Sequence, residues 1–218
     1  QREKALDIYL MPFLFVLIFN HMITRCYLEI TNHCNLDCLF CPKTERAKHR
    51  LSLDEFELLT DKLIGKVEFL YFHLMGEPFL HPLLPQFIQI ARQKNFIPVL
   101  TTNGTLLSKA QGVIEARPHK IQISLHSHEG NAKEHPEEYI RQVMTFVQEA
   151  ASQGILIVLR LWNEGGYDTT NDYIQDLIAQ YQPRPWTQRH DGWKLEKNLY
   201  IEYDRMFEWP DANRNEFD

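Results

Sequence analysis

Residues 34–41 read Cys34-Asn-Leu-Asp-Cys38-Leu-Phe-Cys41, which places three thiols in one short stretch. The chain has 4 cysteines in all, and we expect the fourth, Cys26, to be a small buried side chain within a strand. So tight a group is typical of a metal site or a catalytic thiol rather than of a secreted disulfide framework. The stretch therefore predicts a metal centre in a protein of the reducing cytoplasm.

The composition is that of a soluble globular protein with one domain. The chain has 218 residues, of which 44% are hydrophobic and 24% charged, so it is long enough to bury a core. Its net charge of −6 gives no general attraction to nucleic acid, which binds to basic surfaces. We therefore expect no nucleic-acid partner.

An apolar run, LMPFLFVLIF, occupies residues 10–19. It is shorter than the roughly 20 apolar residues of a transmembrane helix, and it is followed by no small-residue cleavage site of a signal peptide. Three interpretations stay open: an element packed on the domain, an artefact of where the chain begins, or membrane association, against which the length argues. We assign residues 1–23 to an apolar N-terminal segment of open role.

Strands and helices alternate along the rest of the chain. Short β-rich runs predict strands, Ser52 and Glu55 form the capping box of the first helix, and residues 182–197 are expected to be a loop. The expected strands cover 25–31, 67–74, 96–101, 120–125, 155–162 and 198–204, and the expected helices cover 53–64, 83–94, 108–116, 136–152 and 170–181. This alternation predicts a parallel sheet with helices outside, either an open sheet or a partial (βα)6 barrel.

Unusual polar residues follow the ends of several expected strands. The three thiols follow the first strand, Glu77 the second and Asn103 the third, while Ser124 and Arg160 lie late in the fourth and fifth. Active sites of parallel α/β folds lie at the carboxyl ends of the strands. We therefore expect these side chains to share one site.

Three thiolates are one ligand short of the usual four of a zinc or iron–sulfur site. A histidine, with His33 and His49 nearest in sequence, would complete a structural zinc site. The other interpretation is a 4Fe–4S cluster with one iron left open for a cofactor. The open iron also explains the polar residues at the other strand ends, because a bound cofactor would need them.

The spacing Cys34-x3-Cys38-x2-Cys41 after a first strand, with Phe40 before the last cysteine, resembles the signature of the radical S-adenosylmethionine (SAM) enzymes. Residues 76–77, Gly-Glu, resemble the Gly-Gly-Glu motif of that family, with Met75 in place of the first glycine. The resemblance covers residues 24–204. It implies an α/β fold, a partial (βα)6 TIM-like barrel with parallel strands.

The resemblance also implies the cofactors and their ligands. Cys34, Cys38 and Cys41 would bind three irons of a 4Fe–4S cluster, and the fourth iron would bind the methionyl group of SAM. Phe40 would lie near the adenine. No residue is assigned to catalysis on the substrate.

Further SAM contacts follow from the same resemblance. Gly76 and Glu77 would hold the methionyl amino group, whose charge matches the Glu carboxylate. Asn103 and Ser124 would contact the ribose or the methionyl end. Arg160 would pair with the SAM carboxylate, a bidentate role that suits Arg better than Lys.

The reaction implied by the resemblance is reductive cleavage of SAM to a 5′-deoxyadenosyl radical, which abstracts a substrate hydrogen. A reductant such as flavodoxin or ferredoxin would supply the electron. Residues 199–210 resemble the segment that precedes a SPASM-type extension in peptide- and protein-modifying members, so a peptide or protein substrate is expected. No cysteine follows Cys41. Residues 205–218 are therefore interpreted as a tail or a truncated extension.

Two interpretations without catalysis stand beside that of a radical SAM enzyme. The chain is alternatively a non-catalytic α/β protein with a structural zinc or a degenerate cluster site. His73, His126 and His128 are expected to be structural side chains, because most such histidines are.

Overall fold

The computed structural model describes residues 23–131, 135–166 and 168–206. Its strands form one sheet of eight, in the order β1-β2-β3-β4-β5-β8-β7-β6. Strands β1 to β5 and β8 are parallel, and β6 and β7 form an antiparallel hairpin on β8. The strands are β1 (Ile23–Tyr27), β2 (Val67–Tyr71), β3 (Ile97–Thr102), β4 (Lys120–Ser124), β5 (Leu156–Glu164), β6 (Thr187–Arg189), β7 (Gly192–Glu196) and β8 (Leu199–Arg205).

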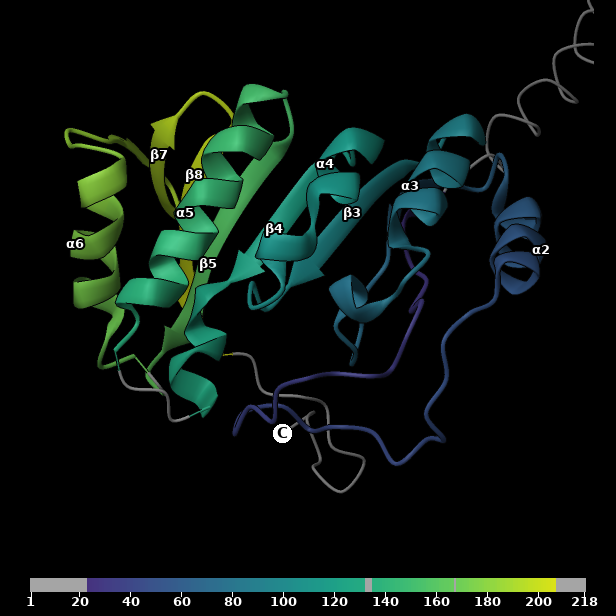
Figure 1. Cartoon of the computed structure of the whole chain (residues 1–218), viewed down its shortest axis with the longest axis horizontal. Coiled ribbons are helices and arrows are strands. Elements are labelled where there is room, and N and C mark those ends of the chain that lie inside the picture. The colour runs from purple at the N-terminus through teal and green to yellow at the C-terminus, as the bar shows by residue number, and fades with distance from the viewer. Residues whose placement is uncertain (1–22, 132–134, 167, 207–218) are drawn as a thin grey trace, which may run out of the picture.

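Five described α-helices connect the parallel strands and lie in front of the sheet in Figure 1. They follow one another across the view in chain order, from α2 to α6. This confirms the predicted α/β fold with six parallel strands. The helices are α2 (Leu53–Leu63), α3 (Leu84–Gln93), α4 (Gln111–Ala116), α5 (Glu137–Ser152) and α6 (Asn171–Tyr181), with 3-10 turns at Pro78–Leu80, Leu107–Lys109, Leu125–Ser127 and Glu129–Asn131.

The two faces of the sheet differ in chemistry because side chains alternate along a strand. One face packs against the helices and forms the apolar core, with residues such as Leu70, Leu100, Ile123 and Leu159 fully buried. We call the opposite face the barrel face. The cross-strand register places on it Arg25, Tyr71, Lys120, Gln122, Ser124, Arg160 and Glu202.

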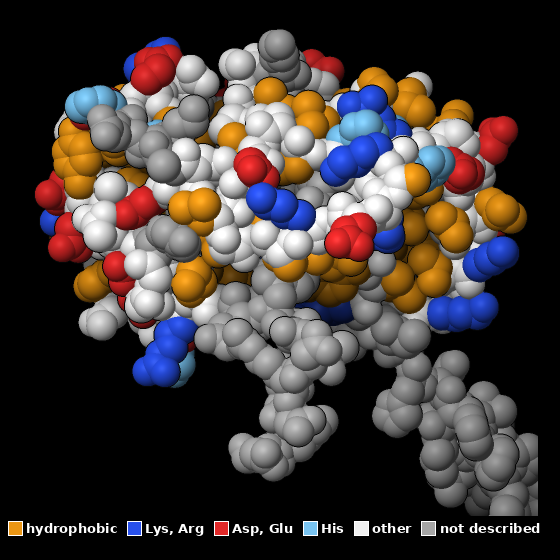
Figure 2. Space-filling model, turned by 90° about the horizontal axis from the view of Figure 1, so that it is seen from below, with side chains coloured by type: hydrophobic (Ala, Val, Ile, Leu, Met, Phe, Trp, Pro, Cys, Tyr) orange, Lys and Arg blue, Asp and Glu red, His pale blue; other side chains and the backbone are white. Residues whose placement is uncertain are grey.

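The surface at the carboxyl ends of the strands has no single sign of charge. Figure 2 looks at this end and shows acidic and basic side chains interspersed. Hydrophobic side chains gather on the side of the view on which α2 lies. Among the exposed apolar side chains of α2 and its C-cap are Leu53, Leu58 and Ile64.

The structure corrects the sequence prediction at three places. The first strand, predicted over residues 25–31, is β1 at Ile23–Tyr27, so it ends four residues earlier than predicted. The predicted loop 182–197 contains the hairpin of β6 and β7, and the predicted helix 108–116 is a 3-10 turn followed by the short helix α4. All three residues of β6 are exposed, so this strand has no apolar alternation that would mark it in the sequence. In β7 the alternation is limited to Trp193 and Leu195, which pack against the core.

The predicted segments at both ends fall largely outside the described residues. These are the apolar segment 1–23, of which the structure describes only Ile23, and the tail 205–218, of which it describes residues 205 and 206. Among the described helices, none combines the length and the apolar character needed to cross a bilayer.

The N-terminus of α2 provides a test of the fold. Ser52 Oγ accepts a hydrogen bond from the Glu55 amide at 3.2 Å, and Glu55 Oε2 accepts one from the Ser52 amide at 2.7 Å. We expect Ser52→Ala to lower the free energy of unfolding by about 1 kcal/mol in urea titrations, since it removes the cap. Ser108→Ala is the control, because Ser108 is exposed and its hydroxyl makes no hydrogen bond among the described residues. Equal effects of the two substitutions would contradict the capping role.

Candidate functional site

The three clustered thiols line one pocket at the carboxyl ends of the strands. The segment after β1 runs beneath the ends of β3 and β4 in Figure 1 and carries all three cysteines. The pocket has a volume of about 210 Å³ and is bordered by residues that follow β1, β2, β3 and β4. Its lining consists of Cys34, Cys38, Phe40, Cys41, His73, Leu74, Gly76, Glu77, Thr101, Thr102, Asn103, Ser124, His126 and Ser127.

Asn131 fastens the cysteine loop to the segment after β4. Its amide nitrogen donates to Cys38 Sγ at 3.0 Å and to the Ser127 carbonyl at 2.7 Å. Its side-chain oxygen accepts from the Asp37 amide at 2.8 Å. One asparagine side chain therefore binds the loop backbone and one of the thiols at once.

Gly130 provides the second attachment on this side. Its carbonyl accepts a hydrogen bond from the Leu39 amide at 2.8 Å. A Cβ at Gly130 would overlap the Phe40 ring, so only glycine lets this ring approach. The ring also lies 5.2 Å from that of His126, centroid to centroid. Phe40 is thus held between two elements that follow β4.

Asn103 connects the cysteine loop to the end of β3. Its amide nitrogen donates to Asn35 Oδ1 at 3.0 Å and lies 4.0 Å from Cys34 Sγ. Asn35 in turn donates to Thr105 Oγ1 at 2.8 Å. Two of the three thiols therefore face a side-chain amide donor from a neighbouring strand end.

The thiols lie close enough to influence one another. Burial raises the pKa of Cys34 and Cys38, and nearby sulfur charges, including that of Cys41, raise both further. The hydrogen bond from Asn131 acts in the opposite direction on Cys38. The raised pKa values favour the protonated state of Cys34 and Cys38, and binding to a metal would favour their ionisation.

A glycine brings the end of β2 against the start of the cysteine loop. A Cβ at Gly76 would overlap the carbonyl oxygen of Thr31. The next amide, of Glu77, donates to the His33 carbonyl at 2.8 Å. Met75, which stands where the Gly-Gly-Glu motif has its first glycine, is not among the residues that line the pocket.

Glu77 is buried and bridges two strand ends. Its Oε1 accepts from the Phe79 amide at 3.0 Å and its Oε2 from the Asn103 amide at 2.7 Å. Burial raises the pKa of Glu77 to about 7, although these two hydrogen bonds and one from the Thr102 side chain favour the charged form. A carboxylate near its midpoint at neutral pH responds strongly to a nearby cation.

Ser124 and Arg160 lie opposite each other on β4 and β5. Ser124 lines the pocket, whereas Arg160 is not part of its lining. The Arg160 guanidinium lies 3.8 Å from the centroid of the Trp162 ring. The structure therefore brings together all the predicted site residues except Arg160, which lies on the same face of the sheet.

Neither histidine proposed as a fourth zinc ligand lines the pocket. His49 Nε2 lies 3.3 Å from Glu55 Oε2, beside the start of α2. No three His, Cys, Asp or Glu side chains within the described part of the chain surround a common point as ligands of a single ion. A 4Fe–4S cluster makes a different demand, because each thiolate binds a different iron.

Several residues of the site were not predicted from the sequence. Asn131 and Gly130 carry no signal beyond their place after a strand. His73 and His126 line the pocket, and burial lowers the pKa of His73 to about 3 and that of His126 to about 4. Both imidazoles are therefore neutral at physiological pH.

Comparison with known families agrees with this arrangement. The model of the radical SAM superfamily matches residues 28–180, which include the cysteine loop, strands β2 to β5 and the four connections that join β1 to β5 in sequence. The chain belongs to the radical SAM superfamily. Enzymes of this superfamily use a 4Fe–4S cluster and SAM, and the donors present here suit both: three neighbouring thiols with amide donors, and a buried carboxylate beside them.

Curated relatives within the radical SAM superfamily match part of the chain. It is 31% identical over 118 residues to the GTP 3′,8-cyclase of Chlorobaculum tepidum, a match that covers 49% of this chain and 34% of that protein. It is also 34% identical over 86 residues to the tungsten-containing aldehyde ferredoxin oxidoreductase cofactor-modifying protein of Pyrococcus furiosus. This match covers 38% of this chain and 24% of that protein. The chain thus spans about a third or less of these relatives' length.

Solved structures of radical SAM enzymes share the fold. SuiB of Streptococcus suis superposes with a TM-score of 0.56 at 14% identity, over 84% of this chain and 50% of SuiB. BtrN in complex with AdoMet and 2-DOIA gives a TM-score of 0.51 at 19% identity, over 65% of this chain and 57% of BtrN. These likenesses confirm the partial barrel, since identities this low support the fold alone.

The hydrogen bond from Asn131 to Cys38 can be tested in the radical SAM chain before any cluster is inserted. We expect Asn131→Ala to move the pH midpoint of Cys38 alkylation by iodoacetamide upward, because the donor that favours the thiolate is lost. Peptide mass spectrometry resolves each cysteine. Cys34, which faces Asn103, is the internal control, and an equal movement of both midpoints would point to general loosening of the loop.

The buried carboxylate makes stability depend on pH. The pKa of Glu77 is raised to about 7 in the folded chain, so the folded state holds a proton that the unfolded chain releases at lower pH. Its contribution to stability is present at low pH and is lost as the pH rises through 7. The wild type should therefore gain about 2–3 kcal/mol over Glu77→Gln between pH 8 and pH 5, measured by urea denaturation. A constant difference across this range would contradict the raised pKa.

Proposed function

We propose that this chain binds a 4Fe–4S cluster through Cys34, Cys38 and Cys41 and binds SAM in the adjoining pocket. The observation that carries the proposal is the convergence of three thiols with Glu77 and Ser124, from other strand ends, on one pocket. When both groups are bound, the chemistry they supply is reductive cleavage of SAM and hydrogen abstraction from a substrate by the 5′-deoxyadenosyl radical.

The chain's own residues would bind and orient SAM. The Glu77 carboxylate would accept hydrogen bonds from the methionyl ammonium. The positive charge of this ammonium would lower the pKa of the carboxyl and keep it ionised. Asn103 and Ser124 offer polar groups for the ribose or methionyl end, and Phe40 an apolar ring for the adenine. The pairing of Arg160 with the SAM carboxylate stays a prediction, because Arg160 is not among the residues that line the pocket of the thiols.

Gly76 would contribute through the backbone. Its lack of a side chain lets the end of β2 approach Thr31, which holds Glu77 beside the thiols. Buried side chains around the pocket, including the neutral His73 and His126, would limit the access of water.

For the substrate we favour a peptide or protein, modified in a reducing cytoplasm with flavodoxin or ferredoxin as the reductant. The support is the segment before the chain's end that resembles the lead into a SPASM extension, and the fold shared with SuiB, a structure of which is bound to the precursor peptide SuiA. Other relatives that match part of this chain are named as a GTP 3′,8-cyclase and an Fe-coproporphyrin III synthase.

Loss of one ligand tests the proposal directly. We expect Cys38→Ala to lose most of the iron, sulfide and visible absorbance acquired on anaerobic reconstitution, while the far-ultraviolet circular dichroism is unchanged. Cys26→Ala is the matched control, because Cys26 packs against the helix-side core and away from the pocket. It should retain the cluster.

The proposed reaction is measured as the 5′-deoxyadenosine formed from SAM when dithionite is added as the reductant. Wild-type protein and Cys26→Ala should form it, and Cys38→Ala should lose it by at least about 100-fold. The proposal is contradicted if the wild type holds zinc tightly, acquires no cluster and forms no 5′-deoxyadenosine. That outcome would favour a structural metal.

A further inference from the structure

The orientation of the Asn131 side chain is fixed by backbone groups on both of its ends. The Asp37 amide donates to Asn131 Oδ1 at 2.8 Å, and Asn131 Nδ2 donates to the Ser127 carbonyl at 2.7 Å. An amide hydrogen must face the side-chain oxygen, and a carbonyl must face the side-chain nitrogen. The nitrogen is therefore directed toward Cys38 by groups other than the sulfur itself.

The turn that carries Asn131 is anchored to a third element. Glu129 accepts hydrogen bonds from the Thr170 amide at 3.2 Å and the Thr170 hydroxyl at 2.8 Å, and from the Thr169 amide at 3.2 Å. Thr170 is the N-cap residue of α6. The 3-10 turn Glu129–Asn131 is thus tied to the start of α6 as well as to the cysteine loop, so the donor is in place before any ligand binds.

Two of the thiols differ in how closely a side-chain amide approaches them. Asn131 Nδ2 lies 3.0 Å from Cys38 Sγ, whereas Asn103 Nδ2 lies 4.0 Å from Cys34 Sγ. A hydrogen bond to a charged acceptor is stronger than one to a neutral acceptor. The donor of Asn131 therefore favours the state of a bound metal group that places more negative charge on the Cys38 sulfur.

We propose that Asn131 is a positioning residue that raises the reduction potential of the bound 4Fe–4S cluster through its Cys38 ligand. Reduction adds one electron, supplied by the reductant, and breaks no bond. Part of the added charge falls on the sulfur ligands, so a donor to sulfur stabilises the reduced form more than the oxidised form. Asn131 is not among the residues that line the pocket of the thiols, and it acts through Cys38. This inference rests on the proposed function.

Loosening of the cysteine loop is the competing explanation, because Asn131 also holds the loop through the Asp37 amide. The two explanations predict opposite signs. A looser loop admits water, which stabilises the more highly charged reduced form and raises the potential. Loss of the donor lowers the potential. The direction of the change in Asn131→Ala therefore separates them.

Asn35 provides a matched control for loosening. Its side chain donates to Thr105 Oγ1 at 2.8 Å and accepts from Asn103 Nδ2 at 3.0 Å, so it also attaches the cysteine loop to a neighbouring strand end. It donates no hydrogen bond to a thiol within the described part of the chain. Asn35→Ala should leave the potential unchanged or raise it.

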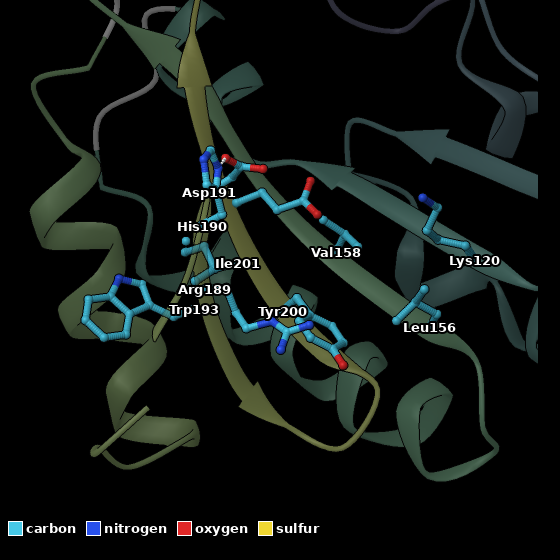
Figure 3. A pocket seen from close by; sticks show the side chains of 11 residues that line it. Lys120, Leu156, Val158, Arg189, His190, Asp191, Trp193, Tyr200 and Ile201 are labelled. Carbon is cyan, nitrogen blue, oxygen red and sulfur yellow. Dashed lines mark hydrogen bonds and ion pairs between the residues drawn. The ribbon is translucent and has the colours of Figure 1, made fainter. Parts of the chain in front are cut away.

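A second pocket on the barrel face provides a control for charge. Its volume is about 370 Å³, and none of the residues that line it lines the pocket of the thiols. Figure 3 shows Arg189, from the hairpin of β6 and β7, at this second pocket. In the sheet, β5, β8 and β7 separate β6 from β4. Arg189→Gln therefore lowers the net charge by one, as Asn131→Asp does, at a distance from the cysteine loop.

The measurement is a redox titration of the full chain after anaerobic reconstitution, followed by electron paramagnetic resonance of the reduced cluster. It is made without SAM at pH 8, where an aspartate of ordinary pKa is ionised. At the wild-type midpoint, Asn131→Ala should lower the ratio of reduced to oxidised cluster at least about threefold. That is a shift of about 28 mV, at 59 mV per tenfold for one electron.

Asn131→Asp should lower the ratio further, because its carboxylate repels the added electron. Arg189→Gln should leave the midpoint unchanged. The iron and sulfide contents of both Asn131 variants should match those of the wild type, since all three thiol ligands remain.

The inference is overturned if Asn131→Ala leaves the midpoint unchanged or raises it, or if Asn35→Ala lowers it as much. An equal shift in Arg189→Gln and Asn131→Asp would also overturn it, because net charge would then account for the change. Loss of the cluster from both Asn131 variants would overturn it in favour of a structural role.

The titration distinguishes this inference from the proposed function. A wild-type chain that acquires no cluster contradicts both. A wild-type chain whose cluster has the same midpoint as that of Asn131→Ala contradicts the inference alone. Shifted midpoints in a chain that forms no 5′-deoxyadenosine would support the inference and contradict the proposed reaction of SAM.

Discussion

The close approach of Gly76 to the backbone at Thr31 is the contact on which the site depends. Any side chain at this position would overlap the Thr31 carbonyl. Because the two backbones meet, the Glu77 amide can donate to the His33 carbonyl, and the cysteine loop begins directly against the end of β2. The glycine thus acts through packing: it determines that the thiols and the Glu77 carboxylate face the same pocket.

Burial leaves that pocket with groups whose charged forms are disfavoured. The carboxyl of Glu77 and the thiols of Cys34 and Cys38 all have raised pKa values because they are removed from water. Each would be relieved by a ligand of opposite charge, an ammonium for the carboxylate and iron for the thiolates. The hydrogen bonds of Asn131 and Asn103 hold these groups in place beforehand, so binding would need little rearrangement of the protein.

Much of this arrangement could be predicted from the sequence, for topological reasons. Parallel strands present their carboxyl ends at one edge, so Glu77, Asn103 and Ser124 had to lie near the cysteine loop. Asn131 could not be found in this way, because its importance arises from a contact with a thiol 93 positions earlier in the chain. The position of Arg160 beyond the pocket lining was also hidden, since it depends on the register between β4 and β5 and on stacking over Trp162.

The two faces of the sheet differ in what constrains their side chains. The helix-side face holds the apolar core, where residues such as Ile121 and Ile123 are fully buried, and stability constrains it closely. The barrel face carries polar and charged side chains that contribute little to that core. Barrel-face positions outside the pocket lining therefore carry fewer packing constraints than core positions. A substitution there should cost less folding free energy than one at Ile121 or Ile123, where the surrounding side chains leave no room.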